Sequence, residues 1–300
     1  WSSDVCSSDL RARYFSLQQA SGAIGGVVAA FAARWLLAEL PFPWGFVACF
    51  ALGTFFVTFV LVVFAQVREP PPDDVAWAEV AAAQSTDDQA HESVGDALAR
   101  RTWWRDVLAL VTDDDGFRLL FAGRALAAVA SMAPAYYAVA AVRRLEATDA
   151  DGATFGAVML GSALFGTLVW GEVAGRFRHP VLIPLGTALG AAAAVGASIA
   201  PDVTWLLGVF AAAGLGSSAL GMADTALPLA LAERAQRSRA LYVAVYATLT
   251  VPFAVLSPLA GGILSGAYGY EAVNGVAVVA YCAAGVVGLR LMRLFPVQAR

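Results

Sequence analysis

The chain has 300 residues, of which 59% are hydrophobic and 14% are charged, and its formal net charge is −4. Soluble domains contain about 45–50% apolar and about 25% charged residues, so this composition lies outside their range. The mean hydropathy of +0.68 points the same way. The composition excludes a secreted disulfide scaffold, a disordered chain, a coiled coil and a nucleic-acid binder with a broad basic face. It predicts an integral, polytopic membrane protein whose first partner is the lipid bilayer.

The first ten residues differ from everything that follows. Residues 1–10 read WSSDVCSSDL, which is rich in Ser and Asp. Their back-translation admits a nucleotide sequence that resembles a widely used sequencing-library adapter. The stretch also lacks the basic start and apolar core of a signal peptide. We therefore expect residues 1–10 to be an adapter artefact, the natural sequence to begin near Arg11, and the natural amino terminus to be missing.

Eight windows of the sequence contain no Asp, Glu or Arg, and the chain has no Lys. Each is about 18 residues or longer, which is enough for a helix to cross a bilayer core of roughly 30 Å. A charge at mid-bilayer is unfavourable, so such windows indicate spans. They predict an all-α membrane protein, a polytopic helical bundle of eight transmembrane helices. The windows are Tyr14–Ala33, Leu40–Val67, Ala125–Val142, Gly152–Gly171, Pro180–Pro201, Val203–Ala223, Ala240–Tyr270 and Ala272–Leu289.

The only long polar segment covers residues 68–116, between the second and third windows, and holds 12 of the 23 acidic residues. It opens with Arg68-Glu69 and three prolines, which end a helix. Within it, 94–111 has helical spacing of apolar residues, and Trp103-Trp104 lies among arginines. We expect an amphipathic linker helix docked at the cytoplasmic interface. A partner-binding element is the alternative.

The distribution of arginine indicates the orientation in the membrane. If the segment before Tyr14 is cytoplasmic, the cytoplasmic side holds fifteen arginines and the other side holds only Arg34, Arg143 and Arg144. Cytoplasmic loops carry the excess of basic residues. We therefore expect both ends of the chain in the cytoplasm, and the protein in a bacterial inner (plasma) membrane.

Pairs of glycines four residues apart occur in several windows. Such spacing lets helix backbones approach closely in a membrane. Together the pairs predict a tightly packed bundle. They are Gly22 and Gly26, Gly152 and Gly156, Gly186 and Gly190, and Gly262 and Gly266.

Three segments of the chain carry recognisable sequence patterns. Residues 171–179, GEVAGRFRH, are similar to Gly-x-x-x-Asp-Arg-x-Gly-Arg, the loop motif of the major facilitator superfamily of transporters, in its second-half position. Gly171 and Arg176 match the motif, whereas Gly175 stands where Asp is usual and Arg178 where Gly is usual. Residues 233–240 with the following span resemble the family's loop before span eleven, and 117–124 resembles the start of span seven.

The family has twelve spans in two six-helix halves, joined by a long cytoplasmic linker. The resemblance therefore implies that the eight windows are spans five to twelve and that the first four are missing. Residues 11–67 are then the last two spans of the N-terminal half, and 68–116 is the linker. Residues 117–294 are the complete C-terminal half, and 295–300 form a cytoplasmic tail.

The resemblance implies secondary active transport of a small solute by alternating access, around a site between the halves near the bilayer midplane. Spans seven and ten line the cavity of the second half in this family. Their candidate cavity residues are Arg124, Ser131, Met132, Tyr136, Tyr137, Ser217, Ser218, Met222 and Asp224. The candidates in the gating loop are Gly171, Glu172 and Arg176.

Two of these candidates carry opposite charges. Counting along the spans places Arg124 and Asp224 at similar depth, and we hypothesise that they form a charge pair at the inner gate. Glu172 is the competing partner for Arg124, and in the alternative interpretation both residues extend to water at the interface. Tyr136 and Tyr137 point about 100° apart on a helix, so at most one faces the cavity. Outer-interface anchors are the other interpretation of these tyrosines.

The few embedded charges favour efflux of amphipathic compounds, with proton coupling through Asp224. A non-transporting scaffold or receptor of the same fold is the alternative. We do not expect an enzyme, a cofactor or a metal site, because His91 and His179 both lie outside the spans and the embedded carboxylate is solitary. We expect a monomer whose partners are a small solute and a proton, with no nucleic acid. This fragment alone is not expected to transport.

Overall fold

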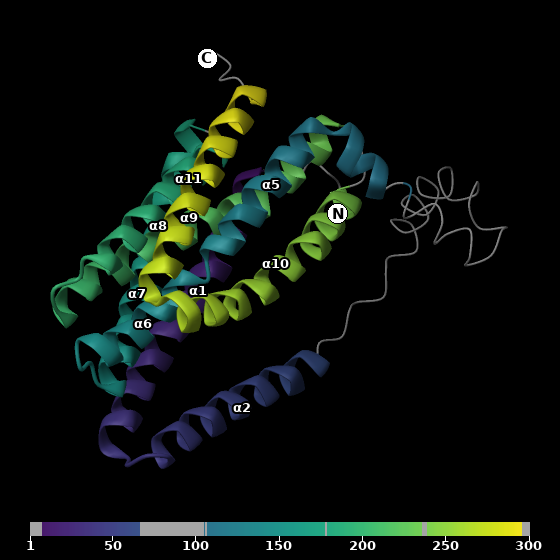
Figure 1. The fold of residues 1–300 in the computed structure, drawn as a ribbon. Helices are drawn as coiled ribbons and strands as arrows, with labels where there is room; N and C mark the ends of the chain where they lie inside the picture. Colours follow the sequence, from purple (N-terminus) through teal and green to yellow (C-terminus); the bar gives the residue numbers. More distant parts are fainter. Residues whose placement is uncertain (1–7, 67–104, 106, 178, 236–238, 296–300) are drawn as a thin grey trace.

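The computed structural model describes residues 8–66, 105, 107–177, 179–235 and 239–295. Over these residues the regular elements are all helical (Figure 1). They are α1 (Ser8–Glu39), α2 (Trp44–Ala65), α5 (Asp115–Ala130), α6 (Ala133–Arg144), α7 (Asp149–Phe177), the short 3₁₀ helix η1 (His179–Val181), α8 (Leu182–Ser198), α9 (Val203–Arg234), α10 (Arg239–Tyr268) and α11 (Tyr270–Leu294). The chain is an all-α bundle, as the composition predicts.

Seven stretches of the described chain are long and apolar enough to cross a membrane. They contain or overlap seven of the eight predicted windows, which confirms a polytopic membrane protein. The remaining window, Tyr14–Ala33, lies within the 32-residue helix α1. The third window corresponds to a single stretch, Asp115–Arg144, that includes both α5 and α6.

The helices from α5 to α11 pack side by side as one bundle. In it α7 and α8 flank α9, α11 packs on α8 and α5, and α10 lies against α5 and α9. α1 joins this bundle along α7. We refer to one end of the bundle as the Asp114 end, where α5 begins and α9 stops, and to the other as the Arg144 end, where α6 stops and α11 begins.

Two apolar clusters fill the bundle. The first contains Tyr137, Phe155 and Phe210, and the rings of the two phenylalanines are stacked with centroids 4.8 Å apart. The second contains Phe117 and Tyr242, whose rings meet edge to face at 5.7 Å. Aromatic rings prefer these two arrangements, because each places the positive ring edge near a negative face.

α2 differs from the other helices in its surroundings. It packs against the end of α1 and lies apart from the rest of the bundle (Figure 1). The most apolar window of Trp44–Val63 is not buried by any of the described residues. Because this surface is almost entirely hydrocarbon, it suits contact with lipid chains or with another apolar helix.

The third span is broken in the middle. α5 ends at Ala130, and Ser131 caps it with its backbone N–H on the carbonyl oxygen of Ala127. α6 begins at Ala133 with Pro134 as its second residue. Proline is tolerated in the first turn of a helix, where its missing N–H has no partner to lose. The break between α5 and α6 therefore falls just before Pro134.

Proline elsewhere is accommodated without a break. Pro252 and Pro258 lie inside α10, which curves along its length (Figure 1). Pro228 lies inside α9. Each removes one backbone hydrogen bond, which membrane helices tolerate when neighbouring groups compensate.

Only some of the glycine pairs provide close helix contacts. A Cβ on Gly186 would lie 2.9 Å from the carbonyl oxygen of Gly216, and one on Gly190 would lie 2.6 Å from the ring of Tyr281. Close packing of α8 against α9 and α11 therefore requires both glycines. At Gly152 and Gly156, by contrast, a Cβ would meet nothing within 4 Å. The sequence motif alone does not separate these two cases.

The end of the linker is helical where it is described. Residues 107–113 are in a helix, and Val107 and Leu110 are buried in the cluster around Phe117. These linker residues therefore pack against the bundle, and the location of the linker helix at the cytoplasmic interface stays a prediction. Trp103 and Trp104 lie outside the described residues, as do 67–102, most of the proposed adapter stretch and the tail from 296 onward.

Candidate functional site

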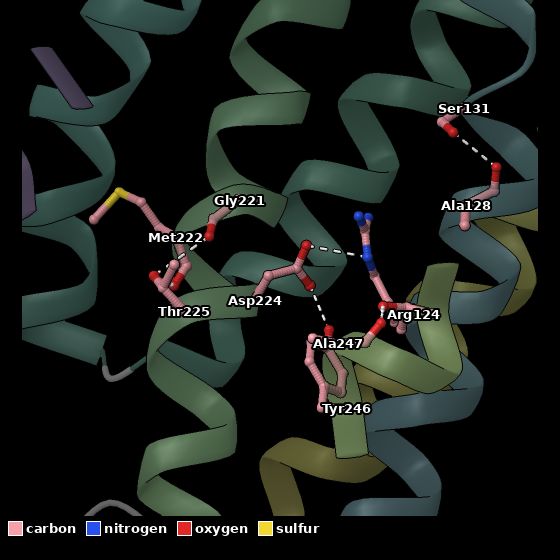
Figure 2. A network of polar contacts seen from close by, with 10 residues as sticks. Arg124, Ala128, Ser131, Gly221, Met222, Asp224, Thr225, Tyr246 and Ala247 are labelled. Carbon is pink, nitrogen blue, oxygen red and sulfur yellow. Dashed lines mark hydrogen bonds and ion pairs between the residues drawn. The ribbon is translucent and has the colours of Figure 1, made fainter. Parts of the chain in front are cut away.

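Three polar side chains from three spanning helices meet inside the bundle (Figure 2). Arg124 of α5 and Asp224 of α9 form an ion pair with 3.1 Å between Nε and Oδ2. Tyr246 of α10 donates its hydroxyl hydrogen to the other carboxylate oxygen, Oδ1, at 2.6 Å. The aspartate therefore uses both of its oxygens, and it joins α5, α9 and α10 at one point.

The ion pair lies deep within the spans. Arg124 is nine residues after the start of α5 at Asp115, or about 14 Å at helical rise. Asp224 is ten residues before the end of α9 at Arg234, or about 15 Å from the same end of the bundle. Their similar depth, expected from the sequence, is confirmed by the contact. The stretches Asp115–Arg144 and Val203–Arg234 have 30 and 32 residues, so each charge lies about a third of the way along its stretch from the Asp114 end.

The surroundings of the pair make it costly to separate. The side chains of Arg124 and Asp224 are 30% and 23% exposed, so water reaches them only in part. Two opposite charges held together in such a place stabilise each other, whereas either one alone would be an uncompensated charge. The other ion pairs of the described residues lie at helix ends or within a single helix. This geometry contradicts the alternative in which both side chains extend separately to water.

Arg124 retains unused donor groups. Among the described residues, Asp224 is the only one that an ion pair or hydrogen bond joins to it. In Figure 2 the dashed contact with Asp224 runs from Nε and not from the two terminal guanidinium nitrogens. A guanidinium carries five N–H donors in a planar fork. Its outer edge can therefore donate to an oxygen of a solute or of water without breaking the pair.

A second tyrosine–aspartate contact lies one turn closer to the Asp114 end. Tyr242 donates to the carboxylate of Asp114, which caps α5 and also accepts from the backbone N–H of Phe117 at 3.0 Å. Tyr242 is fully buried. α10 is thus tied to α5 at Asp114 and to α9 at Asp224, through two tyrosines on the same helical face.

The predicted serines do not converge on the ion pair. Ser131, Ser217 and Ser218 each donate to the carbonyl oxygen three residues earlier in their own chain segment, at 2.7, 2.9 and 2.9 Å. Ser218 faces α7, because its oxygen would lie 2.3 Å from a Cβ on Gly166. Their hydroxyl hydrogens are engaged locally, so these serines offer only acceptor lone pairs.

The remaining cavity candidates separate into core and surface positions. Met132 is buried in the apolar cluster around Phe210, and Met222 is half-buried with its sulfur directed away from Asp224 (Figure 2). Tyr136 donates to the carbonyl oxygen of Pro258 at 2.6 Å, and so contacts α10. Tyr137 packs against Phe210 in the core. The two tyrosines diverge as adjacent helical positions must, and neither reaches the ion pair.

The three predicted gating-loop residues are helical. Gly171, Glu172 and Arg176 all lie in the last turns of α7, which continues to Phe177. Glu172 pairs with Arg176 at 2.9 Å, and both side chains are well exposed. A Glu–Arg pair four residues apart stabilises a helix, which explains why the chain continues as helix through this motif. Glu172 is therefore not the partner of Arg124.

The sequence reasoning missed Tyr246 and Asn274. Tyr242 and Tyr246 are four residues apart near the start of an apolar window, which is a pattern that places two hydroxyls on one helical face. Asn274 is a lone amide inside the last apolar window, and it is buried. A polar side chain inside a span needs a partner. The position of Tyr246 and Asn274 inside apolar windows could therefore have marked both as candidate site residues.

Within the described ranges, no three His, Cys, Asp or Glu side chains come together as a metal site requires. Comparison with family models finds none that matches the chain, and comparison with curated proteins finds no match either. The functional interpretation therefore depends on the geometry of the site and on the arrangement of the helices.

Proposed function

We propose that this chain is part of a secondary active transporter of the major facilitator superfamily, which moves a small solute across a bacterial inner membrane by alternating access. The observation that carries the proposal is the Arg124–Asp224 ion pair, with Tyr246, between three spanning helices. Charged side chains inside spans mark substrate or ion pathways, because each must be compensated. The cytoplasmic location of both ends and a monomeric state belong to the same proposal.

The helix arrangement supports it. The six spans formed by α5 to α11 pack into one bundle, and α1 joins that bundle along α7. A Cβ on Gly26 of α1 would lie 3.0 Å from Leu160 of α7, so these two helices approach closely. In the proposed protein this is a contact between the two halves. Such a contact has to slide or tilt when the halves rock about a central site.

Asp224 is the proposed site of proton coupling. When its carboxylate binds a proton, the negative charge that holds Arg124 is lost. The proton then resides on a carboxyl oxygen, and the guanidinium becomes free to donate to another acceptor. Since Asp224 joins α5, α9 and α10, its protonation loosens the contact of three helices at once. A conformational change biased by one proton needs such a shared point.

The proposed solute is amphipathic, and the proposed direction is export. Apart from the Arg124–Asp224 pair, the buried side chains of the described bundle are mainly alanine, leucine and valine, with several aromatic rings. Apolar walls with a few placed polar groups recognise partly apolar molecules. A sugar carrier would instead be expected to present several amides or charges to the ligand's hydroxyls.

The first experiment reads the source gene upstream of Arg11. Four further hydrophobic spans with a Gly-x-x-x-Asp-Arg loop would support the two-half mechanism. A start codon at or near Arg11 would overturn it, because the second wall of the cavity would then be missing from the protein.

The second experiment measures flux in lipid vesicles that contain the product of the complete gene. A fluorescent amphipathic cation should accumulate only when a pH gradient is imposed, and Asp224→Asn should abolish the gradient dependence. Asp202→Asn is the matched control, since Asp202 caps the far end of the same helix. If neither an amphipath nor a sugar nor a carboxylate moves with the gradient, the transport proposal fails and the scaffold or receptor alternative replaces it.

A further inference from the structure

Two polar atoms are buried without a partner near the Arg144 end of the bundle. They are the hydroxyl oxygen of Tyr137 on α6 and the amide oxygen Oδ1 of Asn274 on α11. The two residues are 2% and 5% exposed. Neither atom has a hydrogen-bond partner among the described residues. Buried polar side chains in folded proteins are almost always hydrogen-bonded, so each of these atoms calls for an explanation.

Both residues line the same cavity. It has a volume of about 50 Å³, and its wall also includes Arg144, Ser198 and Tyr270. One water molecule needs about 10–15 Å³ of such volume, so the cavity has room for roughly three. It is too small for a drug-sized solute, whose sites are about 300–1,000 Å³.

The hydrogen bonds of Ser198 determine which way the Asn274 amide points. The Ser198 hydroxyl donates its hydrogen to the carbonyl oxygen of Ala194 at 3.1 Å. It can therefore only accept from Asn274, whose Nδ2 lies 3.1 Å away. The amide nitrogen is thus placed toward Ser198, and Oδ1 is left needing a donor.

The two atoms need hydrogen-bond partners of opposite kinds. Tyr137 has an O–H to donate, and Asn274 Oδ1 has lone pairs that accept. The cationic group in the wall is already compensated, because Arg144 pairs with Glu271 at 3.0 Å and lies 5.8 Å from the Tyr270 ring centroid. The ligand must accept one hydrogen bond, donate another, fit within a few atoms and carry no charge. Water meets all four conditions.

We propose that this cavity is a water-binding site, in which ordered water accepts from the Tyr137 hydroxyl and donates to Asn274 Oδ1. The site links α6 to α11 through the water and to α8 through Ser198. It makes a wet region inside the apolar cluster around Phe210. It does not depend on the transport proposal, because it follows from two buried atoms and the space between them.

The direction in which Tyr137→Phe changes the melting temperature distinguishes a cavity that holds water from an empty one. In a dry cavity, Tyr137→Phe removes an unsatisfied polar group and raises the melting temperature, or leaves it unchanged. In a water site the same change breaks a hydrogen bond and lowers it by about 2–4 °C. The measurement uses the 300-residue chain in detergent micelles. Tyr136→Phe removes the direct hydrogen bond to Pro258 and gives the fall in melting temperature for the loss of one ordinary hydrogen bond. Tyr268→Phe should leave the melting temperature unchanged, because Tyr268 is exposed.

Radiolytic hydroxyl-radical labelling in ¹⁸O-water gives a second, direct readout. Bound water generates radicals beside the residues that hold it, so Tyr137 should be modified several-fold faster than its buried neighbour Phe155. Phe155 is equally buried but does not line the cavity. A melting temperature that rises or does not change for Tyr137→Phe, or a labelling rate of Tyr137 as low as that of Phe155, overturns the proposal.

Discussion

Tyr242 and Tyr246 lie one turn apart on α10, and each donates its hydroxyl to an aspartate of a different helix. Tyr242 donates to Asp114, which caps α5. Tyr246 donates to Asp224 of α9, which also forms the ion pair with Arg124 of α5. One face of a single helix thus ties together a helix cap and an intramembrane ion pair. Substitutions at these residues should therefore change the stability of the bundle measurably.

The Tyr246 hydroxyl should contribute measurably to folding stability. A buried hydrogen bond to a charged group contributes about 1.5–3 kcal/mol to the free energy of unfolding. We expect Tyr246→Phe to lower the free energy of unfolding by about 1.5–2 kcal/mol in a detergent–denaturant titration. Tyr268→Phe on the same helix is the control, because Tyr268 is exposed. Equal stabilities for the two variants would show that the contact with Asp224 contributes nothing.

The ion pair should show strong coupling in a double-mutant cycle. Arg124→Met and Asp224→Leu each leave one uncompensated charge inside the bundle, so each should lower the free energy of unfolding by about 3–5 kcal/mol. The double variant should recover at least half of that loss, because no lone charge remains. The same cycle on the exposed Glu172–Arg176 pair should give a coupling of about 0.3–0.5 kcal/mol. Additive losses at Arg124 and Asp224 would count against the pair.

Gly190 of α8 should be more sensitive to substitution than Gly156 of α7. A Cβ at position 190 would lie 2.6 Å from the Tyr281 ring, so Gly190→Ala should destabilise the bundle by about 1–3 kcal/mol. At Gly156 nothing lies within 4 Å, and Gly156→Ala should be neutral or stabilising by up to about 1 kcal/mol. Both positions gain the same helix propensity. The difference between the two unfolding titrations therefore measures the steric contact alone.

The proposed orientation can be read from the two ends of the bundle. A variant with its native cysteines replaced would carry a single new cysteine at Asp113 or at Asp149, both of which are exposed. In intact cells, a membrane-impermeant thiol reagent should label Asp149→Cys and should spare Asp113→Cys until the cells are opened. The reverse pattern would invert the proposed topology, and would place the arginine-rich loops outside.

Much of the architecture followed from composition and spacing. A bilayer penalises charges and unpaired backbone groups over its whole thickness, so charge-free windows of sufficient length predict spanning helices. The same one-dimensional counting placed Arg124 and Asp224 at one depth, because a helix rises by a constant 1.5 Å per residue. Depth, length and alternation of direction are properties of single helices, and a sequence states them directly.

Contacts between helices depended on the fold. The sequence did not reveal that Tyr246 completes the ion pair, that Tyr137 and Asn274 share a cavity, or that Gly190 is a tight contact while Gly156 is not. Each of these facts depends on the rotation of one helix about its axis relative to its neighbours. In an apolar chain nearly every face is hydrophobic, so the pattern of residues does not indicate which face meets which. That choice is made by close packing of whole helices, where a shape that fits at many points at once selects the arrangement.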